Sequence, residues 1–276
     1  MVRTKMLIAK IVLTVAAAYV IVVAIIAVTQ TSVIFPAGMA NAQAPVLPSE
    51  ALRLEVATAD GERLVGTHFR PRAGAGDADA LVLGFGGNAA NADGTAMMLR
   101  GLYPDAHVVA FHYRGYGPSS GDASAAALLE DALAVHDAAL SAVKPKRVIA
   151  VGISIGGGLA AYLAKHRVLA GLILVSPFDS LAALARTHYP WAPVDLLLRH
   201  RIPTARYLEG RPTPTALIAA ALDRIVPAAR TQALRPAIGN LVFDRTIPGV
   251  GHNGIYGHPD FPVAMGEALS KILVGK

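Results

Sequence analysis

The sequence contains no cysteine among its 276 residues. No disulfide can therefore stabilise the fold, and the chain must depend on its hydrophobic core alone. The length is ample for such a core, and it suits one α/β domain or at most two small ones.

Signals for metal, cofactor and nucleic-acid chemistry are missing as well. The sequence has no H-E-x-x-H motif, no other cluster of metal ligands and no phosphate-binding loop with its lysine, so neither a metal nor a cofactor is expected. The net charge is +6, but the arginines are spread along the chain without a block of like charges. This pattern indicates a surface that faces solvent or a membrane, and no nucleic acid is expected as a partner.

Hydrophobic residues, by contrast, are abundant at 54%, and their excess lies at the start of the chain. Residues 11–28, IVLTVAAAYVIVVAIIAV, contain no charged side chain. As a helix they would be about 27 Å long, close to the thickness of the hydrocarbon layer. Arg3, Lys5 and Lys10 precede them. This predicts a single-pass membrane protein with a cytoplasmic N-terminus and the rest of the chain on the far side, periplasmic or extracellular in a bacterium.

A cleaved signal peptide and a helix buried in a soluble core are the alternatives. Small residues in an A-x-A pattern occur in ANAQA, residues 40–44, but they lie a dozen residues beyond the apolar run, and the run is longer than the core of a usual signal peptide. An uncleaved segment is therefore favoured, with residues 1–30 as cytoplasmic tail and transmembrane anchor. Residues 31–50, rich in proline and alanine, are expected to be a linker.

Residues 51–276 are expected to form one α/β domain. LRLEVAT and RLVGTHFR each alternate apolar and polar residues, and they lie on either side of an ADG turn. This pattern predicts an antiparallel hairpin. Short apolar runs then alternate with segments of helical spacing, which predicts a mostly parallel sheet with helices on both faces. The runs are residues 80–85, 107–111, 147–152, 171–176, 215–220 and 240–247. Residues 177–212, which hold the only tryptophan, are expected to be a small helical insertion over one end of the sheet.

One serine stands between glycines at a predicted junction of strand and helix. Residues 148–166 read VIAVGISIGGGLAAYLAKH, and a glycine two residues before and two residues after Ser154 is the pattern of a nucleophile elbow. Such a turn raises the serine hydroxyl above the edge of the sheet, while Gly152 and Gly156 let the strand and the helix approach each other. The alternative is a tight structural turn without catalysis.

A serine hydroxyl attacks only when a base takes its proton, and the base needs an acid to orient it. In a parallel-sheet hydrolase both follow the serine at the ends of later strands, the acid first. Asp223 and His252 hold these positions, so Ser154, Asp223 and His252 are the predicted triad. A helix cap and a loop histidine are the alternatives for the last two. The less favoured candidates are His188, His200, His258, Asp195 and Asp244.

The oxygen of an attacked carbonyl becomes negative and needs two donors. The backbone N–H of Ile155, at the start of a helix, is one expected donor. The N–H of Asn88, in the glycine-rich loop LGFGGNAANADG, is the other. The same loop contains GFGGNA, which fits the dinucleotide pattern G-x-G-x-x-A. The next apolar run, however, ends at His112 and Arg114 rather than at an acidic residue, which disfavours nucleotide binding.

Together these residues resemble the α/β-hydrolase superfamily, and most closely its single-pass membrane-anchored branch, which includes bacterial hydrolases and eukaryotic protein depalmitoylases. The matching segments run in order along nearly the whole chain: VIFP, GGNAAN, YRGYGPSSG, GISIGGG, SPFDSL, HYPWAPVDLLLR, LDRIVP and GHN. The resemblance implies the α/β-hydrolase fold. It also implies Ser154, Asp223 and His252 as the triad, with Ile155 and Asn88 as oxyanion donors.

The chain departs from that branch in two places. The branch usually has His-Gly-Asn where this sequence has Gly86-Gly87-Asn88, so a loop-bracing imidazole is missing. It also usually has an aspartate before YRGYG, where this sequence has His112. The first departure concerns the oxyanion loop, and the second is expected to change only local packing.

The sequence thus predicts a membrane-anchored serine hydrolase that cleaves carboxylic esters or thioesters through an acyl-enzyme. The expected substrate is a small or lipid-like acyl ester, because residues 177–212, rich in Leu, Ala, Pro, Tyr and Trp, would place an apolar wall above Ser154. A serine peptidase of the aminopeptidase kind is one alternative, although residues 177–212 offer no acidic cluster for a free amine. A non-catalytic binding domain on the same fold is another.

Overall fold

In residues 2–72 and 79–274, which a computed structural model describes, eight strands form one sheet in the order β1-β2-β4-β3-β5-β6-β7-β8. Strands β1 and β2 pair antiparallel around the expected turn, β2 is also antiparallel to β4, and the remaining neighbours are parallel. The bounds are β1 Leu52–Ala57, β2 Arg63–Phe69, β3 Ala80–Phe85, β4 His107–Phe111, β5 Arg147–Ile153, β6 Gly171–Val175, β7 Thr215–Ala220 and β8 Leu241–Ile247. The predicted hairpin and the six predicted parallel runs are thus confirmed.

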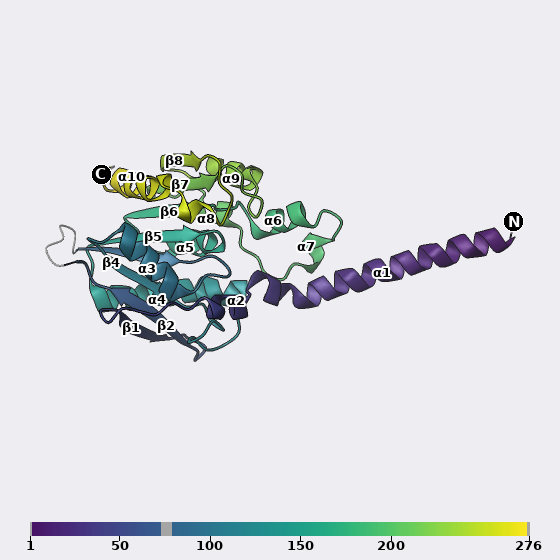
Figure 1. Cartoon of the computed structure of the whole chain (residues 1–276), viewed down its shortest axis with the longest axis horizontal. Helices are drawn as coiled ribbons and strands as arrows, with labels where there is room; N and C mark the ends of the chain where they lie inside the picture. Colours follow the sequence, from purple (N-terminus) through teal and green to yellow (C-terminus); the bar gives the residue numbers. More distant parts are fainter. Residues whose placement is uncertain (1, 73–78, 275–276) are drawn as a thin grey trace.

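Helices cover both faces of the sheet, as Figure 1 shows. Successive residues of a strand point to opposite faces, so Leu81 and Leu83 of β3 pack in one core and Val82 in the other. Both cores are fully closed to solvent at these positions. The first core includes α4 Ala125–Val143 and α5 Ile155–His166, and the second includes α3 Ala92–Leu102 and α10 Asp260–Val274. The remaining short helices near the C-terminal strands are α9 Ala228–Leu234, η1 Arg235–Ala237 and η2 Ile255–Gly257.

The expected insertion of short helices follows β6 at the carboxyl end of the sheet. It consists of α6 Leu181–His188, α7 Val194–Leu197 and α8 Thr204–Leu208. The side chain of Ser180 caps α6 by accepting a hydrogen bond from the N–H of Ala183. In Figure 1, α6 and α7 project beyond the sheet toward the N-terminal helix.

The N-terminal helix α1, Val2–Ile34, extends away from the α/β domain along the longest axis of the molecule (Figure 1). It is long and apolar enough to cross a membrane, and its most apolar stretch is not buried against the rest of the chain. A signal sequence near an N-terminus can also be long and apolar enough for this. The structure therefore supports a membrane span or a signal segment rather than a core helix.

Residues 31–50 differ from the expected linker. Helix α1 continues to Ile34, and a second helix, α2 Ala37–Ala42, follows directly. Phe35 and Ala40 are buried in the same hydrophobic core as strand β3. The apolar patch that looks isolated in the sequence thus packs against the domain, and the junction between α1 and the domain is anchored rather than free.

Candidate active site

Ser154 occupies a sharp turn between β5 and α5. Its backbone angles are φ 53° and ψ −118°, a conformation that costs a residue with a side chain about 1–3 kcal/mol and persists only where the surroundings enforce it. The N–H of Ser154 donates to the carbonyl of Val175, 2.8 Å away, and its own carbonyl accepts from the N–H of Gly157 at 2.9 Å. The turn is therefore held on both sides, as a nucleophile elbow requires.

The two glycines around Ser154 have no room for a side chain. A Cβ atom at Gly152 would lie 2.5 Å from the Cα atom of Gly157, and one at Gly156 would lie 2.2 Å from the carbonyl oxygen of Phe85. The first glycine lets β5 and α5 meet, and the second lets the loop after β3 approach the start of α5. The G-x-S-x-G pattern thus arises from contacts between backbones.

Asp223 follows β7 and His252 follows β8, and their side chains are in direct contact. The Nδ1 atom of His252 lies 2.6 Å from Oδ2 of Asp223, and both side chains are almost completely buried. The other carboxylate oxygen accepts hydrogen bonds from the N–H groups of Ile225 and Val226, at 2.9 and 2.7 Å. An ionised carboxylate beside Nδ1 favours the proton on that nitrogen, which leaves Nε2 free to accept one.

Ser154 lies at the same edge of the sheet as this pair. Strands β5, β6, β7 and β8 are parallel neighbours, so their carboxyl ends, which carry Ser154, Asp223 and His252, meet at one edge. Each of the three residues is at most 9% exposed. The structure thus brings Asp223 and His252 into hydrogen-bond contact and places Ser154 at the same edge of the sheet.

The two expected oxyanion donors border the same cavity as Ser154. Ile155 is the first residue of α5, so its N–H has no acceptor within the helix. Asn88 lies in the loop after β3, and both residues line the cavity together with Ser154. The geometry therefore leaves two backbone segments available near the serine.

Two tyrosines that the sequence reasoning missed hold the loop of Asn88. The hydroxyl of Tyr113 donates to the carbonyl of Gly86 at 2.7 Å, and that of Tyr116 donates to the carbonyl of Asn88 at 2.6 Å. Burial raises the pKa of both phenols, so they remain donors. Both belong to the YRGYG segment, which stands out in the sequence, but its contact with a loop that lies some 25 residues earlier in the chain depends on the fold. They brace the loop where the branch usually has a histidine.

His112, the second departure, lies in a buried polar cluster behind the loop. Its Nε2 atom is 3.2 Å from Oδ1 of Asp93, which also accepts hydrogen bonds from Arg53 and Thr67. Burial opposes the charge of Asp93, but the close approach of His112 and the hydrogen bonds from Arg53 and Thr67 hold its pKa well below the usual range. His112 thus connects the end of β4 with the start of α3.

The less favoured candidates have partners of their own. His188 bonds the carbonyl of Ile225, His200 bonds Thr31, His258 bonds the N–H of Asp260, Asp195 pairs with Arg186, and Asp244 pairs with Arg235. Within residues 2–72 and 79–274, no three His, Asp or Glu side chains converge as metal ligands.

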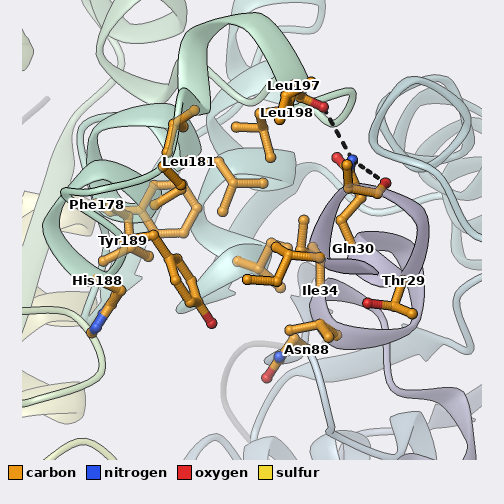
Figure 2. Close-up of a pocket in the computed structure, with 18 of the residues that line it drawn as sticks. Thr29, Gln30, Ile34, Asn88, Phe178, Leu181, His188, Tyr189, Leu197 and Leu198 are labelled. Atoms are coloured by element: carbon orange, nitrogen blue, oxygen red, sulfur yellow. Dashed lines mark hydrogen bonds between the residues drawn. The ribbon is translucent and has the colours of Figure 1, made fainter. Parts of the chain in front are cut away.

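A cavity of about 380 Å³ opens above Ser154. Leu181, Leu184 and Leu197 of α6 and α7 form one wall, which is the apolar wall expected from the insertion. The opposite wall comes from α1, for which the sequence predicts only a membrane span. Figure 2 shows Ile34 of α1 on the side of the cavity opposite Leu181, while the side chain of Gln30 meets the carbonyl of Leu197.

Comparisons with known proteins agree with this architecture. A family model for the alpha/beta hydrolase fold matches residues 81–207. The chain is 36% identical over 223 residues to the uncharacterised protein Rv2307c of Mycobacterium tuberculosis. The aligned region covers 79% of this chain and 78% of that relative.

Solved structures show the same fold at low sequence identity. The esterase Pf2001 of Pyrococcus furiosus matches with a TM-score of 0.67 at 20% identity, over 83% of this chain and 96% of the esterase. A membrane phospholipase A, described as a bacterial virulence factor, matches with a TM-score of 0.63 at 17% identity. That match covers 98% of this chain and 99% of the phospholipase, so it extends over the N-terminal helix as well.

Proposed function

The chain belongs to the alpha/beta-hydrolase family, and from this premise we propose that it is a membrane-anchored serine hydrolase that cleaves carboxylic esters or thioesters. One observation carries the proposal: a strained serine turn at the sheet edge that also bears a buried, hydrogen-bonded Asp223–His252 pair. Strain of this kind is found mainly at functional sites. The bonds from the N–H groups of Ile225 and Val226 to one oxygen of Asp223 are those of a local turn. The bond between the other oxygen and His252 is the one that a catalytic acid requires.

The proposed reaction is acyl transfer in two halves. The hydroxyl oxygen of Ser154 bonds to the acyl carbon while its proton passes to Nε2 of His252, and the N–H groups of Ile155 and Asn88 donate to the negative oxygen. The carbon–oxygen or carbon–sulfur bond then breaks, and Nε2 returns the proton to the leaving group. In the second half a water molecule gives a proton to Nε2 and its oxygen bonds to the acyl carbon. The bond between that carbon and Oγ of Ser154 then breaks, and Nε2 returns the proton to Oγ, which releases the acid and restores Ser154.

An ester or thioester with an apolar acyl chain suits the cavity better than a peptide does. No Asp, Glu, Lys or Arg occurs among the described residues that line the cavity, so nothing there would bind the free amine of an aminopeptidase substrate. The walls are leucine, valine, isoleucine and alanine side chains for the most part. Each methylene buried there contributes about 0.8 kcal/mol, so two further carbons raise kcat/KM by roughly tenfold until the cavity is full.

The test of this activity is a comparison of substrates. The purified full-length protein is assayed with p-nitrophenyl acetate, butyrate, octanoate and palmitate, and with an aminoacyl p-nitroanilide. The proposal predicts that kcat/KM rises along the ester series until the cavity is full, and that the amide is turned over more slowly than the best ester. A flat ester series contradicts the apolar chain preference, and an amide that reacts faster than every ester favours a peptidase. The absence of any turnover favours a binding domain.

We further infer that α1 anchors the protein in a membrane with its N-terminus in the cytoplasm, because Arg3, Lys5 and Lys10 precede the apolar run. In a Gram-negative host the full chain should remain in the membrane pellet after carbonate extraction. Protease added to spheroplasts should digest the α/β domain. A soluble form that begins near Ala44 or Pro45 would instead identify a signal peptide.

A further inference from the structure

The last turns of α1 have a second role besides spanning a membrane. We propose that they form one wall of the acyl-chain site, and that the chain held there is an acyl chain of a bilayer lipid, which enters between α1 and the α6–α7 segment. This inference rests on the proposed esterase activity of Ser154. It makes the anchor a determinant of substrate specificity.

The residues of α1 that face the cavity form a single stripe. Most of the α1 residues that line it are spaced by three or four residues and so lie on one side of the helix, with Thr29 at the margin; they are Val23, Ile26, Ala27, Gln30, Val33 and Ile34. The α6–α7 segment supplies the opposite side (Figure 2). The cavity is therefore a slot between a helix of the anchor and the insertion, and Ser154 belongs to its lining.

The dimensions of the slot suit one extended alkyl chain. Eleven residues separate Val23 from Ile34, a rise of about 16 Å along the helix. A zigzag of carbon–carbon bonds of about 1.5 Å at angles near 111° advances roughly 1.25 Å per carbon, so this wall matches about 13 carbons. The volume of about 380 Å³ is also within the roughly 300–1,000 Å³ of small-molecule sites.

Polar contacts fix α1 in this position. The side-chain amide of Gln30 donates to the carbonyl of Leu197 at 3.1 Å and accepts from the N–H of Arg199 at 2.8 Å. Thr31 bonds the imidazole of His200 at 2.9 Å. Gln30 is 6% exposed, so these bonds are largely shielded from water and hold the wall against the segment between α7 and α8.

The position of the slot favours a lipid as the occupant. Val23, Ile26 and Ala27 belong both to the uncharged run 11–28 and to the wall of the cavity. The hydroxyl of Tyr19, one turn further toward the N-terminus, donates to the carbonyl of Trp191 at 3.0 Å, so the tip between α6 and α7 reaches along the apolar part of α1.

That tip has the composition of a membrane-facing segment. Residues 189–194, YPWAPV, carry no charge, and tyrosine and tryptophan are enriched where bilayers meet water. Trp191 is 46% exposed, and Leu196 of α7 is 81% exposed. With α1 across a bilayer, the gap between α1 and this tip opens among the lipid chains, and an acyl chain reaches Ser154 without passing through water.

A matched pair of substitutions on α1 tests the wall. Ala27 lines the slot, whereas Ala24, one turn away, is exposed and does not line it. Full-length wild type, Ala27→Phe and Ala24→Phe are compared in detergent micelles with p-nitrophenyl esters from acetyl to palmitoyl. For Ala27→Phe we expect the ratio of kcat/KM for the dodecanoyl ester to kcat/KM for the acetyl ester to fall by about tenfold or more. A fall of this size is expected when the cavity can no longer bury two or more methylene groups of the chain. For Ala24→Phe the ratio should stay as in the wild type.

A third variant guards against a folding defect in Ala27→Phe. Val23→Ala removes bulk at the far end of the wall and should move the optimum of the ester series to longer chains. If neither Ala27→Phe nor Val23→Ala changes the series while the wild type hydrolyses esters, the inference about α1 is wrong and the proposed esterase activity stands. If the wild type hydrolyses no ester, both fail.

The source of the chain is tested in vesicles. Wild type, Ala27→Phe and Ala24→Phe are reconstituted into vesicles of an ether-linked phosphatidylcholine, which has no ester bond, with a small fraction of didodecanoyl phosphatidylcholine. Wild type and Ala24→Phe should release dodecanoate, and Ala27→Phe should release about tenfold less. A wild type that hydrolyses soluble dodecanoyl esters in micelles but releases nothing from the vesicles would overturn the assignment of a bilayer lipid.

Discussion

His252 and Asp223 are joined by a hydrogen bond of 2.6 Å between Nδ1 and a carboxylate oxygen, in a site that is almost closed to solvent. The second carboxylate oxygen is held by two backbone N–H groups in the turn after β7. Asp223 is thus fixed on one side by its own loop and directs the imidazole with the other. The orientation of the imidazole therefore depends on the carboxylate of Asp223.

Replacement of Asp223 by asparagine should remove most of the activity. The side-chain amide of the variant would present a donor to Nδ1, which favours the wrong tautomer, and kcat should fall by about 10⁴ with little change in KM. Asp244→Asn, at a surface carboxylate paired with Arg235, is the control and should remain within about twofold of wild type. Steady-state hydrolysis of a p-nitrophenyl ester measures both. Comparable losses in the two variants would speak against a role for Asp223 in catalysis.

Gly156 should tolerate no side chain. A Cβ atom there would meet the carbonyl oxygens of Phe85 and Gly86 at 2.2 and 2.5 Å, so Gly156→Ala must displace the loop that carries Asn88. We expect a loss of about 1–3 kcal/mol in the free energy of unfolding, together with a loss of kcat. Gly101→Ala in α3, where nothing lies within 4 Å, should instead stabilise the protein by about 0.5–1 kcal/mol. Thermal unfolding and ester hydrolysis distinguish the two, and an active, stable Gly156→Ala protein would refute this packing.

The tyrosines of the YRGYG segment should act as positioning residues. Tyr113→Phe removes the hydrogen bond to the Gly86 carbonyl, and Tyr116→Phe removes the one to Asn88. Loss of a direct oxyanion donor costs about 10²–10³ in kcat, and loss of a brace behind it should cost less, about tenfold, with KM unchanged. Tyr162→Phe, whose hydroxyl bonds Glu130 at the surface, is the matched control. A change in KM without a change in kcat would assign these tyrosines to substrate binding instead.

Acid should destabilise the protein through His68. Burial, with repulsion from His107 and Arg70, lowers its pKa to about 4 from 6.5, so between these values the unfolded chain binds a proton that the folded chain does not. The contribution of this residue to stability is therefore complete above pH 6.5 and is lost as the pH falls toward 4. The decrease in Tm from about pH 7 to about pH 4.5 should be smaller in His68→Gln than in the wild type. The exposed His166→Gln variant serves as control, and equal decreases in all three proteins would exclude His68.

The strands and the elbow were predictable because they depend on local patterns. Short apolar runs bounded by turn residues, such as 80–85 and 215–220, are strands within a residue of their predicted ends. Asp223 and His252 could be chosen as candidates because each follows a predicted parallel strand after Ser154, in the order typical of a parallel-sheet hydrolase. These features need no knowledge of which distant segments touch.

The remaining features depend on contacts between segments far apart in the sequence. The apolar run of α1 predicts a membrane span whether or not the last turns of this helix contact α7. The hydrogen bond between Gln30 and the carbonyl of Leu197 could therefore not be inferred from the sequence. The same holds for Tyr113 and Gly86. Residues 31–50 were expected to be a linker because proline and alanine dominate them, yet Phe35 is buried in the core.

Covalent labelling of Ser154 distinguishes a catalytic serine from a serine in a purely structural turn. The purified full-length protein is incubated with a fluorophosphonate, and the labelled peptide is identified by mass spectrometry, with Ser154→Ala and the surface variant Ser141→Ala treated in parallel. Ser141 lies in α4 and is exposed. The account predicts one covalent adduct on Ser154 in the wild type and in Ser141→Ala, and none in Ser154→Ala. An adduct that persists in Ser154→Ala, or a folded wild type that is never labelled, would contradict it.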